Sequence, residues 1–172
     1  MAAAPSAHAQ GVTAEAVAEG FVAAVRVCVA SRLTGAAIAD LAEADRAGLL
    51  PGDATLREFM EARAEQPVWT TQNGAGIVAI VEHAPAQCNV TAYGPRVEPV
   101  MAQVAAALQA AYPTVAVEPL ERRPDALVQR FSLTVGEARI SVLIDGGEPG
   151  MRGRRFRFPL LMAFVQRRSA AP

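Results

Sequence analysis

The most constraining feature of this sequence is a long alternation of apolar and polar residues near its C-terminal end. It extends over residues 127–135, 139–145 and 155–165. The apolar positions that alternate along these segments are Phe131, Leu133, Val135, Ile140, Val142, Ile144, Phe156, Phe158, Leu160, Met162 and Phe164. Successive side chains of a strand point to opposite faces of its sheet. The pattern therefore predicts an antiparallel meander, and the concentration of phenylalanine predicts that this face holds the largest share of the core.

Helical patterns precede all predicted strands. Residues 13–31 predict a first helix, with Thr13 as its N-cap and an apolar stripe along one side. Residues 34–47 and 55–63 predict two shorter helices. The N-terminal third of the chain is thus expected to be helical.

The middle of the chain predicts strands that are joined by short turns. Asn73-Gly74 separates residues 68–72 from residues 76–82. This dipeptide favours a hairpin because a type I′ turn needs positive φ at both central residues. Residues 87–93 predict the next strand.

A helix over residues 95–112 and a strand over residues 115–120 complete the pattern before the meander. The order is therefore helices, three strands, one helix and a four-strand meander. Strands that follow one another through short turns pair antiparallel, and their helices gather on one face. We expect an α+β fold, with N-terminal helices packed with a mostly antiparallel β-sheet.

Length and composition fit one folded domain. The chain has 172 residues, of which 52% are hydrophobic and 19% charged. Such a chain can bury a core and is not of the disordered class. We expect residues 13–168 to form a single α+β domain and residues 169–172 to be a frayed tail.

The first twelve residues suggest a compartment. Ala7-His8-Ala9 before Gln10 matches the small-x-small pattern that precedes a signal-peptidase site. We interpret residues 1–12 as a disordered remnant of a secretory signal, which predicts a periplasmic or secreted protein. The alternative is an unstructured terminus of a cytoplasmic protein.

The charge and hydropathy of the chain limit the classes of partner that we expect. A net charge of −1 disfavours an overall attraction to nucleic acid. No apolar run reaches the length of a membrane-spanning helix, so no membrane insertion is expected. Every basic side chain is arginine, which together with the abundant alanine indicates a GC-rich bacterial genome. The alternative is selection for bidentate contacts with anions.

The chain has two cysteines, Cys28 and Cys88. In an oxidising compartment such a pair predicts one disulfide, which would stabilise the fold by roughly 4 kcal/mol through loop closure. The alternative is two separate buried thiols.

One local cluster suggests catalysis. His83 and Cys88 lie on either side of a predicted turn, so a hairpin would place them near the same end. A histidine beside a cysteine can produce the reactive thiolate. The alternative is a solvated histidine and a core or disulfide cysteine.

A second cluster suggests binding. Four arginines follow a glycine-rich loop: Arg152, Arg154, Arg155 and Arg157. Arginine forks bind phosphate or carboxylate groups bidentately, and Arg130 and Arg139 would extend the basic stripe if their strands pair. The alternative is a charged outer face or a guarded edge strand.

Three function classes follow. The first is a secreted or periplasmic bacterial protein that binds another protein or a small anionic ligand without catalysis, at the arginine cluster. The second is a thiol-dependent or other hydrolase that uses Cys88 and His83. The third is a structural subunit whose sheet edge pairs with a partner strand. The sequence predicts no cofactor and no metal, and it leaves the ligand, the oligomeric state and the strand order open.

Overall fold

The computed structural model describes residues 13–46, 48–71, 78–83, 86–153 and 158–168. The expected signal remnant, the Asn73-Gly74 turn and the expected frayed tail lie outside these described residues.

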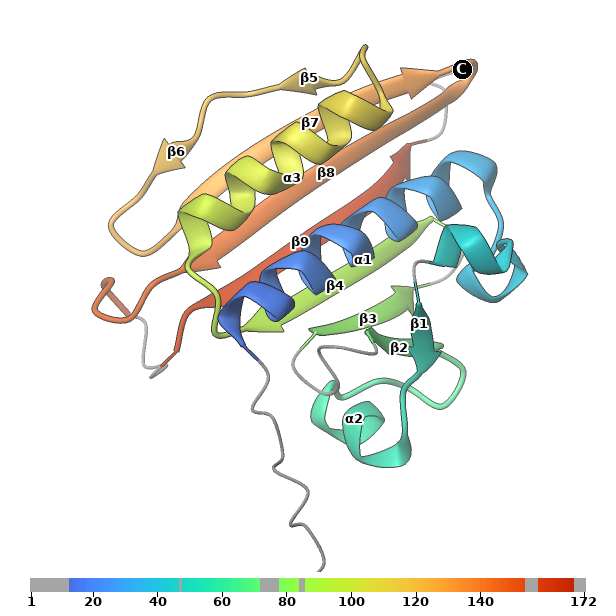
Figure 1. Ribbon diagram of the computed structural model, residues 1–172, viewed down its shortest axis with the longest axis horizontal. Coiled ribbons are helices and arrows are strands. Elements are labelled where there is room, and N and C mark those ends of the chain that lie inside the picture. The colour runs from blue at the N-terminus through green and yellow to red at the C-terminus, as the bar shows by residue number, and fades with distance from the viewer. Residues whose placement is uncertain (1–12, 47, 72–77, 84–85, 154–157, 169–172) are drawn as a thin grey trace, which may run out of the picture.

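Two long helices lie on one face of an antiparallel sheet (Figure 1). They are α1 (Ala14–Thr34) and α3 (Val97–Ala111), and a short helix, α2 (Ala54–Phe59), lies beside the first strands. The described strands are β1 (Leu49–Pro51), β2 (Val68–Thr71), β3 (Val78–His83), β4 (Gln87–Tyr93), β5 (Ala116–Val117), β6 (Glu121–Arg122), β7 (Leu127–Val135), β8 (Ala138–Gly147) and β9 (Leu160–Arg168). The predicted α+β class with an antiparallel sheet is confirmed.

The sheet order is β1-β2-β3-β4-β9-β8-β7-β5, and β6 also pairs with β7. Each long helix is followed by a run of antiparallel strands, and the two runs meet where β4 pairs with β9. Strands from the two halves of the chain therefore share the centre of one sheet.

Helix α1 extends three residues beyond its predicted end. The Thr13 hydroxyl accepts a hydrogen bond from the Ala16 amide at its N-terminus, as expected of a cap. Gly35 ends the helix with a φ of 75°, a conformation that glycine adopts without strain. The Thr34 hydroxyl donates back to carbonyls of the last turn, including that of Ala30, instead of starting a second helix. The expected helix over residues 34–47 is replaced by two short 3₁₀ turns, at Ile38–Asp40 and Glu43–Arg46.

The core lies between the sheet and the two long helices, but the residues that β9 contributes to it are not the predicted ones. Leu161, Ala163 and Val165 are completely buried, whereas Phe164 is half-buried on the other face and Phe158 is 64% exposed. Val165 is in register with buried residues on both neighbouring strands, and this pairing decides which face of β9 meets the helices. In β7 and β8 the predicted face is the core face, apart from the exposed Val135.

The other face of β4, β9, β8 and β7 points away from α1 and α3, and we call it the open face. Its side chains are mostly half-buried or exposed, as their alternation with the buried residues shows. Over the neighbouring strands β2 and β3 this face is covered instead, where Leu56 of α2 packs with Val68, Ala79 and Val81. Four strands thus present an uncovered surface beside a covered one.

Candidate functional site

The structure places the predicted arginine cluster only in part. Arg154, Arg155 and Arg157 lie outside the described residues. Arg152 is exposed, and its backbone amide donates to the Pro124 carbonyl at 3.0 Å.

A different group of arginines is brought together on the open face. Arg130 of β7 and Arg139 of β8 share this face, as the sequence suggested, and Arg168 of β9 joins them. The three arginines line a groove of about 520 Å³. Between them lie the hydroxyls of Ser132 and Ser141, with Gln87, Gln166, Leu143 and Phe164 also lining the groove.

The three arginines differ in their electrostatic partners. Arg130 donates to Glu121 at 3.1 Å, and Arg123 donates to the same carboxylate at 2.8 and 3.0 Å. The hydrogen bonds from Arg123 and Arg130 lower the pKa of Glu121 to about 2. Arg139 and Arg168 make no ion pair with a carboxylate of the described residues. The positive charge available to a ligand is therefore at the Arg139 and Arg168 end of the groove.

Cys88 and His83 are not brought together. Glu82 pairs with Cys88 and His83 pairs with Gln87 across the β3–β4 hairpin, so the two candidate residues point to opposite faces of the sheet. The sulfur atoms of Cys88 and Cys28 lie at disulfide-bonding distance, with Cα atoms 5.8 Å apart. A thiol enzyme would need Cys88 to be free and on the same face as its histidine.

His83 is held by two side-chain amides. Its Nδ1 lies 2.7 Å from Gln66 Nε2, and its Nε2 lies 3.0 Å from Asn89 Nδ2. The Gln66 amide is itself fixed, because its oxygen accepts a hydrogen bond from the Arg63 backbone at 2.8 Å. Both ring nitrogens are thus occupied by neighbours within the protein.

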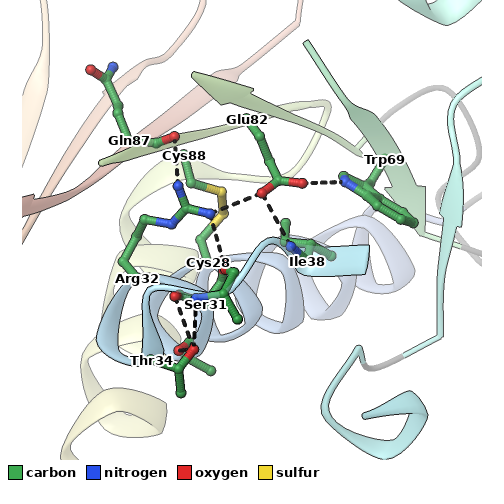
Figure 2. A network of polar contacts seen from close by, with 11 residues as sticks. Cys28, Ser31, Arg32, Thr34, Ile38, Trp69, Glu82, Gln87 and Cys88 are labelled. Carbon is green, nitrogen blue, oxygen red and sulfur yellow. Dashed lines mark hydrogen bonds and ion pairs between the residues drawn. A yellow bond between two sulfur atoms is a disulfide. The ribbon is translucent and has the colours of Figure 1, made fainter. Parts of the chain in front are cut away.

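A buried polar network lies next to the cysteine pair (Figure 2). Arg32 donates to Glu82 at 2.9 Å, and the two side chains are 1% and 6% exposed. The same carboxylate accepts hydrogen bonds from Trp69 Nε1 at 2.9 Å and from the Ile38 amide at 3.2 Å. Sequence reasoning missed this network, which links α1 to strands β2 and β3.

The network lies at the floor of a second cavity, of about 760 Å³, at the C-terminal end of α1. Its exposed rim carries both acidic and basic side chains, among them Glu61, Arg63 and Glu65. Because the buried carboxylate already has three donors and the rim has mixed charge, the cavity favours no class of ligand by charge.

No group of three or more histidine, cysteine, aspartate or glutamate residues in the described part of the chain could hold a metal ion. Among the described helices, none combines the length and the apolar character needed to cross a membrane.

In comparisons with known proteins, no protein-family model, no curated protein and no solved structure matches this chain.

Proposed function

We propose that this chain is a non-catalytic binding protein whose open face binds a small anionic ligand. The observation that carries the proposal is the groove of about 520 Å³ on this face, which has three arginines along it. Its volume is within the range of small-molecule sites. Arginine forks suit carboxylate and phosphate groups, and two of the three have no carboxylate partner among the described residues.

The contacts that Cys88 and His83 make favour a binding function over thiol catalysis. Cys88 is completely buried at bonding distance from Cys28, and both nitrogens of His83 are occupied by amides. A nucleophilic thiolate needs an adjacent base, which this geometry does not provide.

The same cysteine pair supports an extracytoplasmic location. Disulfides persist in the bacterial periplasm and outside the cell, and are rare in the cytosol. Together with the signal-like Ala7-His8-Ala9 stretch, the pair favours a secreted or periplasmic bacterial protein. Location would be tested by fractionating cells that express the full-length gene product.

The binding proposal is tested by filling the groove. Ser132 is exposed on the open face, so Ser132→Trp places an indole in the groove without touching the core. The oxidised protein is titrated with a panel of small phosphates, sulfates, monocarboxylates and dicarboxylates at constant ionic strength, and its amide NMR signals are followed. We expect at least one anion to shift signals of β7, β8 and β9, and Ser132→Trp to abolish the shifts.

Thr114→Trp is the matched control, because Thr114 is exposed after α3 and does not line the groove. It should leave binding unchanged. If no anion shifts the signals of the open face, or if binding survives Ser132→Trp, the proposed function is wrong.

A further inference from the structure

Two arginines of the groove stand directly opposite each other. Arg139 of β8 is the register partner of Arg168 of β9, and both are exposed on the open face. Like charges directly opposite on neighbouring strands destabilise a sheet. On the other side of Arg139, its partner on β7 is Thr134, whose hydroxyl is neutral. This row of the sheet therefore concentrates two positive charges without compensation from the strands that form it.

The acidic residue that lines the groove lies far from Arg139 and Arg168. Glu118 lines the groove, but its backbone amide pairs with Arg130, which is four residues from Thr134 along β7. Four residues of strand span roughly 13 Å. The carboxylate that neutralises Arg130 is Glu121, which belongs to the same distant end. The Arg139 and Arg168 pair is thus separated from the acidic end of the groove.

Each arginine of the pair has a hydroxyl side chain beside it: Thr134 is the register partner of Arg139, and Ser141 contacts Arg168. Ser141 Oγ accepts a hydrogen bond from Arg168 Nε at 3.4 Å, which orients that guanidinium and leaves its terminal nitrogens as donors. Two guanidinium forks with adjacent hydroxyls suit a group that has several oxygens and two negative charges. A phosphate ester has a charge of about −1.5 to −2 at pH 7, whereas a single carboxylate would neutralise only one fork.

Resting on the proposed function, we infer that Arg139 and Arg168 form the subsite for the phosphate group of a small phosphorylated molecule. The remainder of that molecule extends toward Phe164 and Leu143, which are cross-strand partners two rows along the groove. The direction follows from the side chains of β8 and β9, where charged and polar residues give way to the half-buried Leu143 and Phe164, while Arg130 occupies the same row on β7.

The inference predicts the direction of a change in stability as well as a loss of affinity for phosphate. Arg139→Gln and Arg168→Gln each remove the like-charge repulsion, so each should raise the urea midpoint in low salt without phosphate, or leave it unchanged. The same variants should bind a sugar phosphate and inorganic phosphate roughly ten- to a hundredfold more weakly, the factor expected on losing one charge-assisted hydrogen-bonding partner. Wild-type protein should be stabilised by phosphate beyond the effect of acetate at equal ionic strength.

Arg122→Gln is the matched control. Arg122 is exposed and pairs with Glu98 away from the groove, so this variant should keep the full response to phosphate. Arg139→Lys keeps the charge but loses the fork, and it should bind phosphate with intermediate affinity.

The inference is overturned if both glutamine variants bind phosphate as wild type does, or if Arg122→Gln weakens binding equally. It also fails if the glutamine variants lose stability in low salt, or if phosphatidic acid vesicles bind through the pair while sugar phosphates do not. Binding of a dicarboxylate that Ser132→Trp abolishes, without any binding of phosphate, would refute the phosphate subsite and leave the proposed function standing.

Discussion

Removing the Glu82 carboxylate is the sharpest test of how the buried network supports the fold. Glu82→Ala would take the acceptor from three donors at once: the Arg32 guanidinium, the Trp69 indole and the Ile38 amide. It would also leave the positive charge of Arg32, a side chain that is 1% exposed, without its counter-ion.

Breaking a buried ion pair on one side costs about 3–5 kcal/mol, because the remaining charge stays desolvated. A domain of this size has a free energy of unfolding of about 5–15 kcal/mol. Glu82→Ala should therefore remove a fifth or more of the stability. Urea unfolding followed by far-UV circular dichroism measures the loss without depending on the environment of Trp69.

A double variant that removes both charges should recover part of the lost stability. Arg32→Met combined with Glu82→Met removes both charges, and it should be less destabilised than Glu82→Ala alone, because no unpaired charge remains. Glu98→Ala breaks an exposed pair with Arg122 and should leave the urea midpoint unchanged. A loss below about 1 kcal/mol for Glu82→Ala, or a double variant as unstable as the sum of its single variants, would refute the argument.

Three further predictions test separate contacts. Replacing Cys28 and Cys88 by serine should lower the free energy of unfolding by about 4 kcal/mol, the loop-closure value for a 60-residue separation, and the wild-type cysteines should alkylate only after reduction. Gly146→Ala should destabilise by about 1–3 kcal/mol, because its new methyl group would overlap Val97 at the start of α3, and Val97→Ala in the same chain should recover part of the loss in urea unfolding. The lowered pKa of Glu121 predicts a contribution to stability that is present above its ordinary value of 4.5 and is lost as the pH falls toward 2; an acid titration should show this loss in wild type and not in Glu121→Gln.

Local pattern was sufficient to predict most strands. The strand over Gln87–Tyr93 and the first strand of the meander, Leu127–Val135, have the predicted bounds. Buried residues alternate strictly with half-buried ones in the first of these strands, and in the second the alternation holds over residues 130–134. The face of β9 could not be predicted in this way, since apolar residues occupy both of its faces. Only its register with β4 and β8, strands distant in sequence, decides that Val165 and not Phe164 enters the core.

The candidate site, too, could be predicted only where the pattern within one strand was sufficient. Arg139 was predicted on a basic stripe if its strand paired with its neighbours, but Arg168 was missed because the last predicted strand, over residues 155–165, ended before it. Its significance depends on a pairing across 29 positions, which periodicity within one strand does not reveal. The buried ion pair of Arg32 and Glu82, by contrast, could have been predicted from the sequence. Arg32 lies one helical turn after Cys28, and Glu82 lies opposite Cys88 in the hairpin, so a Cys28–Cys88 link implies that the two charges meet.

This proximity leads to a last prediction, that the cysteine link and the ion pair are energetically coupled. Both join α1 to the β3–β4 hairpin at the same place (Figure 2). If the disulfide acted only by restricting the unfolded chain, its loss and Glu82→Ala would add independently. Because the link also holds α1 against the hairpin, its removal should let the Arg32 guanidinium move toward water once the Glu82 carboxylate is gone, and Glu82→Ala should then cost less. Urea unfolding of wild type, Glu82→Ala, Cys28→Ala/Cys88→Ala and the triple variant should give a coupling energy of about 0.5–3 kcal/mol with this sign. Additive losses, or a larger cost of Glu82→Ala without the link, would show that the disulfide does not position Arg32.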